Sequence, residues 1–176
     1  MENQFRVRPA GGGDVAALVA LVNSAYRGES SRAGWSTEAD LIGGIRVDVE
    51  RVDAAITGDG HVVLVHESEE GIVGCVQLEM TGEDCYLGML TVRPTLQGGG
   101  LGRRLIDAAE EWASTRWHAR AMYMTVLEQR PELIAWYERR GYSITSERKP
   151  FPYGDERWGL PARGDLEFLV LRKLLR

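Results

Sequence analysis

The chain has 176 residues, of which 44% are apolar and 27% are charged, and its formal net charge is −5. This length is enough to bury a substantial core, so we expect one domain over residues 1–176. The negative charge disfavours a nucleic-acid-binding protein, which would carry a basic face. The chain has no apolar run of membrane-spanning length, no signal peptide, and two cysteines, too few for a disulfide framework. We therefore expect a cytoplasmic protein without a membrane partner.

The first part of the chain predicts one short strand and several helices. Residues 5–8 alternate and predict a strand, and Asp14 is a favourable N-cap for a helix that follows. Ser36 or Thr37 can cap a second short helix. Residues 48–56 carry apolar side chains at helical spacing before a glycine turn.

The rest of the chain predicts most of a sheet. Three successive strands, at 61–66, 72–80 and 85–92, indicate an antiparallel meander. The strand–helix–strand passage over 85–127 should be right-handed, which makes its two strands parallel. We expect a further helix between Pro131 and Gly141 and further strands at 121–127, 142–146 and 166–171. The predicted fold class is α+β, a mixed and mostly antiparallel sheet with helices on both faces.

The most informative segment spans residues 90–105, Leu-Thr-Val-Arg-Pro-Thr-Leu-Gln-Gly-Gly-Gly-Leu-Gly-Arg-Arg-Leu. An extended apolar run stops at Pro94, a glycine cluster follows, and an amphipathic helix then begins. Glycines allow a ligand to approach the backbone closely, and the free N–H groups of a first helical turn attract anions. The segment therefore predicts a phosphate or pyrophosphate site.

Other interpretations of the glycine segment fit less well. A P-loop needs a Gly-Lys dipeptide, which the chain lacks. A dinucleotide fingerprint would require glycine where the chain has Arg103 or Leu105. A plain glycine-rich turn remains as the alternative without a ligand.

Two motifs resemble those of the GNAT acetyltransferases. The first is Gln97-x-x-Gly100-x-Gly102 after a strand, which resembles the acetyl-CoA loop of that family. The second, residues 133–142, resembles the family's C-terminal helix, whose usual form is Ala-x-x-Tyr-Glu-x-x-Gly-Phe. The resemblance covers residues 72–146 and implies a GNAT-like acyl-CoA N-acyltransferase fold, one N-acetyltransferase domain, and acetyl-CoA as co-substrate.

The resemblance also implies residue roles. Backbone groups of the strand from Leu90 to Val92 would bind the pantetheine arm, and amides of Gly98 to Arg103 would bind the pyrophosphate. Many family members have Asn seven residues before the helix tyrosine, where this chain has Arg130. Arg130 should pair with a cofactor phosphate or with an acidic neighbour such as Glu128. The predicted cofactor-binding residues are Leu90, Thr91, Val92, Gln97, Gly98, Gly99, Gly100, Leu101, Gly102, Arg103 and Arg130.

The predicted catalytic residues are Tyr137 and Glu79. The resemblance places Tyr137 near the thioester sulfur, where a phenol could protonate the departing thiolate. Glu79, near the end of its strand, is one candidate base. Glu128, a base acting through water, or no dedicated base are the alternatives, and Thr125 stands where some relatives have glutamate. The three histidines are scattered and form no metal-ligand set with the cysteines, so no metal is expected.

Two segments are candidates for binding the acetyl acceptor. The first, residues 26–35, contains the predicted substrate-binding residues Tyr26, Glu29 and Trp35. The second, residues 150–158, is aromatic and rich in proline, and long loops are often functional. The acidic residues of these segments, Glu29, Asp155 and Glu156, would favour a cationic amine.

The predicted function is transfer of an acetyl group from acetyl-CoA to a primary amine of a small molecule. Acetylation of a protein N-terminus or lysine is the first alternative, and a non-catalytic acyl-CoA-binding module is the second. The acceptor's identity, the preferred acyl chain and the oligomeric state stay open, with a homodimer as one alternative.

Overall fold

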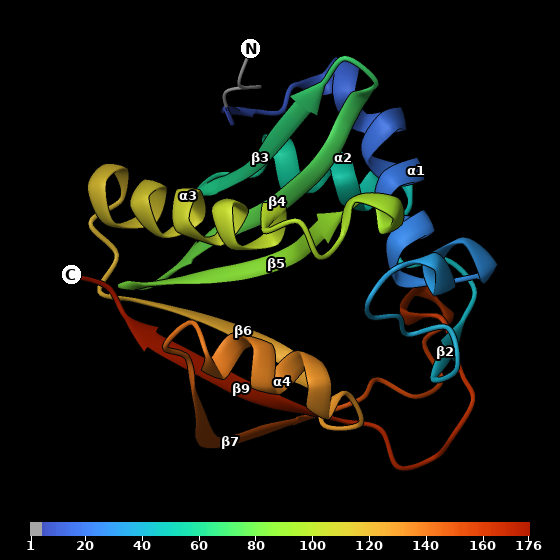
Figure 1. Cartoon of the computed structure of the whole chain (residues 1–176). Coiled ribbons are helices and arrows are strands. Elements are labelled where there is room, and N and C mark those ends of the chain that lie inside the picture. The colour runs from blue at the N-terminus through green and yellow to red at the C-terminus, as the bar shows by residue number, and fades with distance from the viewer. Residues whose placement is uncertain (1–4) are drawn as a thin grey trace.

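The computed structural model describes residues 5–176, and within them seven strands form one twisted sheet (Figure 1). Five of the six pairings between neighbouring strands are antiparallel, and only β5 and β6 pair in parallel. The mixed, mostly antiparallel sheet predicted from the sequence is confirmed. In spatial order the strands are β1 (Val7–Pro9), β3 (His61–Ser68), β4 (Gly71–Thr81), β5 (Asp84–Val92), β6 (Ala121–Leu127), β9 (Glu167–Leu174) and β7 (Ser143–Pro150).

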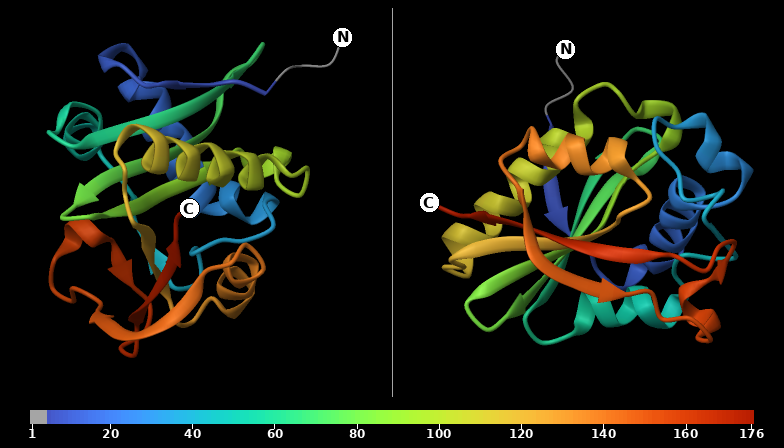
Figure 2. Two further views of the ribbon diagram at one scale, coloured as in Figure 1. Left: turned by 90° about the vertical axis from the view of Figure 1, so that its left-hand side faces the viewer. Right: turned by 90° about the horizontal axis from the view of Figure 1, so that it is seen from below.

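Helices cover both faces of the sheet, as the fold-class prediction requires (Figures 1 and 2). Helices α3 (Leu101–Arg116) and α4 (Pro131–Glu138) share one core with the sheet, and α1 (Val15–Tyr26) and α2 (Val49–Thr57) share the other. None of the helices in the described part of the chain is both long and apolar enough to cross a membrane.

The sequence of β3 shows why both faces are covered. Val62 and Leu64 enter the core under α3, whereas Val63 and Val65 enter the core under α1 and α2. Because successive side chains of a strand point to opposite faces, a continuous apolar run needs cover on both sides. The sheet is thus buried between two helical layers.

Two local predictions are wrong. No helix follows Ser36 or Thr37, because the Thr37 hydroxyl instead accepts the backbone N–H of Ala39 at 3.0 Å in a turn. The chain then forms β2 (Ile42–Gly43), which pairs with β8 (Leu160–Pro161). Strand β7 also runs to Pro150 instead of Ser146; its residues are mostly exposed, so it lacks the alternating apolar pattern by which strands are recognised.

Strands β5 and β6 separate along their length, and this separation creates the site. Their parallel pairing covers only Asp84–Tyr86 against Ala121–Tyr123. Further along, β5 has a bulge opposite β4, and Met89 adopts a φ of +48° there. A bulge bends its strand and increases the local twist. Figure 1 shows the two strands diverging toward the end where α1, α4 and the β2 region lie.

Candidate active site

Two adjoining pockets occupy the region between the separated strands. The larger pocket has a volume of about 480 Å³, and the smaller pocket has a volume of about 300 Å³. Five residues line both pockets and therefore form the junction between them: Tyr26, Leu90, Arg130, Leu133 and Tyr137. Both pockets thus open onto the same few groups of α1, β5 and α4.

The glycine segment lies in the wall of the smaller pocket. Gly98 and Gly100 have φ values of +86° and +83°, which L side chains rarely adopt, and no atom lies within 4 Å of where either Cβ would stand. Helix α3 begins at Leu101, and the carbonyl of Gly100 accepts the backbone N–H of Arg104. The N–H groups of residues 101–103 come before this hydrogen bond and have no carbonyl acceptor within the helix. They are therefore available to bind an anion. Backbone geometry and space both fit a phosphate.

Besides Arg130 at the junction, three arginines line the smaller pocket. They are Arg103 from α3 and Arg139 and Arg140 from the end of α4. The Arg140 guanidinium lies 3.7 Å from the centre of the Trp136 ring, and its Nε is buried with no hydrogen-bond partner among the described residues. Burial, followed by the charges of Arg139 and Arg103, lowers the pKa of Arg140. Several arginines and an unpartnered Nε at one pocket of a protein of net charge −5 form a local positive region that suits an anionic ligand.

The side chain of Gln97 forms hydrogen bonds to both the segment that precedes β2 and the end of β5. Its Oε1 accepts the N–H of Trp35 at 2.7 Å, and its Nε2 donates to the carbonyl of Val92 at 3.0 Å. A Cβ on Gly34 would stand 2.5 Å from Oε1, so a larger residue there would displace the Gln97 amide. The side chain of Gln97 is therefore engaged within the protein. Trp35, expected at the acceptor, lines the smaller pocket instead.

Tyr137 is buried at the junction, where it lines both pockets. Its ring packs edge-on against Trp136 and Tyr142, with ring centres 5.1 and 5.9 Å away. Burial raises the pKa of the phenol well above its usual value. Its hydroxyl has no hydrogen-bond partner within residues 5–176, so the proton is held and available at the junction.

Arg130 belongs to a buried ion-pair cluster. Its guanidinium donates to Glu38 at 3.2 Å and to the Ser36 hydroxyl at 2.6 Å, and Arg27 approaches the other oxygen of Glu38 at 3.4 Å. The acidic neighbours of Arg130 are thus Glu38 and, at 3.9 Å, Glu132, while Glu128 pairs with Arg148. Glu38 has no motif around it in the sequence, so only the fold reveals it.

The larger pocket contains the candidate base. Glu79 lines it and stands 3.4 Å from Nε2 of His61, whereas Glu128 does not line either pocket. The Tyr26 hydroxyl donates to the carbonyl of Leu90 at 2.9 Å, and burial raises the pKa of Tyr26 to about 12. Thr125 also lines this pocket.

Aromatic residues of the 150–158 segment form a wall of the larger pocket. Phe151 and Trp158 line it, whereas the acidic residues of the candidate acceptor segments do not. Asp155 pairs with Arg157 at 2.7 Å, and Glu29 pairs with Arg32 at 3.0 Å on the surface. The structure therefore brings Tyr26, Tyr137 and Glu79 to the site and leaves Glu29 outside it.

Comparisons with known proteins found similarity in both sequence and fold. The sequence model of the Acetyltransferase (GNAT) family matches residues 33–142. The ribosomal-protein-S18-alanine N-acetyltransferase from Escherichia coli has a similar structure, with a TM-score of 0.72 at 12% identity over 98% of this chain and 94% of that one. A variant of the spermidine N-acetyltransferase from Vibrio cholerae gives 0.71 at 15% identity, over 99% and 95%. The ribosomal-protein-alanine N-acetyltransferase from Brucella melitensis gives 0.71 at 22% identity, over 97% and 99%.

Proposed function

Because the chain belongs to the GNAT acetyltransferase family, we propose that it transfers an acetyl group from acetyl-CoA to a primary amine of a small molecule. The observation that carries the proposal is the junction, where Tyr137 lines both the phosphate-compatible smaller pocket and the larger pocket. Acetyl-CoA in the smaller pocket and an amine in the larger pocket would meet at the Tyr137 side chain.

Acetyl-CoA supplies an acyl thioester and several phosphate charges. The free N–H groups at the start of α3 and the arginines of the smaller pocket bind these charges, since a helix N-terminus and guanidinium groups both favour anions. Residues Leu90 to Val92 line the path from this anion site to the junction. The protein thereby holds the thioester at the point where the larger pocket begins, which lowers the entropic cost of the reaction.

Proton transfer at the junction needs two further groups. The acceptor must be a neutral amine, because an ammonium ion has no lone pair for attack. Glu79, in the larger pocket, can take that proton directly or through water, and Tyr137 can give its proton to the departing thiolate. The raised pKa of Tyr137 keeps the phenol protonated at neutral pH.

The size of the larger pocket favours a small acceptor over a protein chain. Its volume of about 480 Å³ lies within the range of roughly 300–1,000 Å³ that is usual for small-molecule sites. Phe151 and Trp158 wall it on the side of the 150–158 segment. The similar structures include both protein and polyamine acetyltransferases, so the test must offer both kinds of acceptor.

We expect free thiol to be released from acetyl-CoA when the protein is supplied with the correct small amine. The measurement is thiol release across a panel of amino acids, polyamines and aromatic amines, with peptide N-termini and peptide lysines included. Release with peptides alone would assign a protein acceptor. Binding of acetyl-CoA without release for any amine would instead indicate a binding module.

The glycine segment gives a prediction about the donor. Gly100→Val should weaken acetyl-CoA binding at least about tenfold, roughly 1.4 kcal/mol, because a β-branched residue is strained at a φ of +83° and fills the space beside the anion site. Calorimetric titration with acetyl-CoA measures the effect. Gly82→Val is the matched control, since Gly82 has a φ of +66° in the turn between β4 and β5. Equal affinity in folded Gly100→Val and wild-type protein would contradict the assignment of the anion site.

A further inference from the structure

The larger pocket is lined by more positively charged than negatively charged side chains. Cationic groups outnumber carboxylates in its lining: Arg27, Arg46, Arg130 and Lys149 against Glu38 and Glu79. A pocket for a polyamine would be expected to show the opposite balance, because like charges repel more strongly where water is excluded. The partners of each cation decide which charge is available to a ligand.

Most of these charges have partners within the protein. Glu38 lies between Arg27 and Arg130, and Arg27 also donates to the carbonyls of Ile45 at 2.6 Å and Trp158 at 3.1 Å. These two guanidinium groups are therefore occupied.

Lys149 lies at the end of the pocket that contains Glu79. Its Nζ is 5.9 Å from the Tyr123 ring, which contacts Tyr86, the cross-strand partner of Glu79. Lys149 also approaches Glu147 at 3.9 Å. The Lys149 ammonium therefore has one carboxylate near it, that of Glu147.

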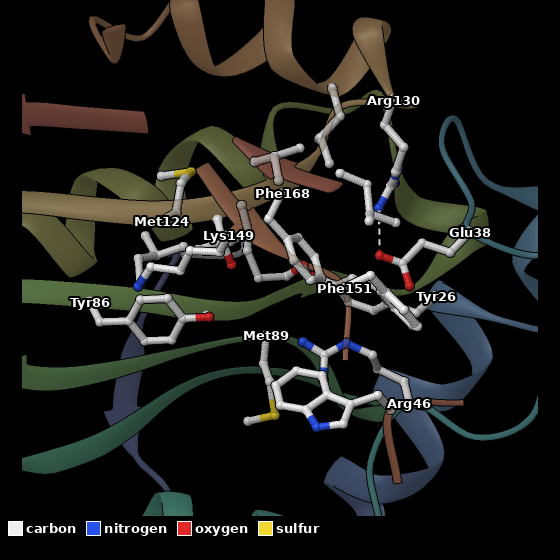
Figure 3. Close-up of a pocket in the computed structure, with 18 of the residues that line it drawn as sticks. Tyr26, Glu38, Arg46, Tyr86, Met89, Met124, Arg130, Lys149, Phe151 and Phe168 are labelled. Carbon is white, nitrogen blue, oxygen red and sulfur yellow. Dashed lines mark hydrogen bonds and ion pairs between the residues drawn. The ribbon is translucent and has the colours of Figure 1, made fainter. Parts of the chain in front are cut away.

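Arg46 is different, because it forms no ion pair with any residue in the described part of the chain. Its backbone N–H is held by the side chain of Asn23 at 2.7 Å, and its guanidinium lies over the Tyr26 ring at 5.3 Å. Figure 3 shows that guanidinium within the pocket, close to Phe151 in the view. Two other cations interact with its charge, since Arg46 contributes to lowering the pKa of both Arg27 and Arg51.

The position of Arg46 relates it to the reaction. The same Tyr26 ring that lies under the guanidinium carries the hydroxyl that donates to Leu90 at the junction. Arg46 is thus separated from the junction by one tyrosine side chain. A small acceptor could place its amine at the junction and a second group at Arg46.

We propose that the acceptor is an amino acid or a closely similar amine that carries an anionic group, and that Arg46 binds this group. The proposal rests on the proposed function and specifies the class of acceptor. A guanidinium presents a planar pair of donors that matches a carboxylate in two parallel hydrogen bonds. Met89, Phe151 and Phe168 line the same pocket and offer apolar contacts to the remainder of the molecule. The acids expected to favour a cationic acceptor, Glu29, Asp155 and Glu156, do not line it.

The test compares amines that differ only in the anionic group. The twenty standard amino acids are screened by thiol release with acetyl-CoA, and each active one is compared with its primary amide and its decarboxylated amine, with spermidine as a cationic probe. We expect kcat/KM for the acid to exceed that for its amide by about 10- to 100-fold, the size expected of a charge-assisted bidentate contact. Arg46→Gln should lower kcat/KM for the acid about 10- to 100-fold more than for the amide and so remove this preference, and Arg46→Lys should keep part of it. Arg120→Gln, an exposed arginine paired with Glu83, is the control that keeps the preference.

A binding measurement separates this proposal from the proposed function. Calorimetric titration of the protein with phenylalanine and methionine, and with their amides, in the presence of coenzyme A reports the anion contact without turnover. Binding of the acids that is lost in Arg46→Gln supports the proposal even if no amine is acetylated, which would count against the proposed function alone. Equal use or equal binding of acid and amide, a preference for spermidine, or a preference that survives Arg46→Gln would overturn the proposal.

Discussion

Tyr137→Phe is expected to lower kcat about 10- to 10³-fold, with acetyl-CoA affinity and Tm nearly unchanged. The substitution keeps the ring and its packing against Trp136 and Tyr142, and removes the hydroxyl that has no protein partner at the junction. Steady-state kinetics, calorimetry and thermal unfolding of the same preparation measure the three quantities. A loss confined to kcat is the signature of a proton donor.

The control for Tyr137 is Tyr142→Phe. Tyr142 is also buried, but its hydroxyl donates to Glu110 at 2.9 Å and it does not line either pocket. Its removal should reduce stability by about 1–2 kcal/mol and leave kcat unchanged. If Tyr137→Phe turned over at the wild-type rate, the thiolate would leave unassisted or take its proton from water.

The pH profile gives an independent check on Tyr137. The phenol acts as an acid only while protonated, and burial raises its pKa, so activity that depends on it should persist to higher pH than for an ordinary tyrosine. The rate should therefore rise with pH as the amine loses its proton and show no descending limb below about pH 10. A descending limb near neutral pH would assign the acid to another group.

Glu38→Gln is expected to destabilise the protein by about 3 kcal/mol. The carboxylate lies between the guanidinium groups of Arg27 and Arg130, and all three side chains are almost fully buried. Removing one member of a buried ion-pair cluster leaves uncompensated charge and typically costs roughly 3–5 kcal/mol. We expect the low end, because Arg27 keeps two carbonyl partners and Arg130 keeps Ser36.

Denaturant unfolding measures the effect of Glu38→Gln, and Glu83→Gln is its matched control. Glu83 also pairs with an arginine, Arg120 at 2.6 Å, but both side chains are exposed. Water therefore replaces the lost contact, and the free energy of unfolding should not change. If both substitutions lowered the free energy of unfolding by the same small amount, the buried ion-pair cluster would not stabilise the protein.

Elements with strong local signals follow from the amino-acid sequence alone. The apolar runs of β3, β4 and β5, the glycine segment before α3 and the exit glycine after α4 are patterns over a few neighbouring residues. Local conformational preference and periodicity decide such elements, so the fold class and the position of the glycine turn before α3 could both be predicted. Tyr137 could be proposed in the same way, because it lies within a contiguous motif.

The lining of the larger pocket follows only from the tertiary structure. Glu38 comes within hydrogen-bond distance of Arg130 although 92 residues separate them, and Arg27 donates to the carbonyl of Trp158 across 131 residues. The acidic residues of the two candidate segments favoured a cationic acceptor. The sequence could not show that Glu29 and Asp155 form ion pairs with nearby arginines on the surface. The divergence of β5 from β6 is a consequence of sheet pairing and of the bulge in β5, neither of which a local pattern specifies. Long-range packing therefore determines which charges remain available inside the pocket, because only the folded chain brings their partners together.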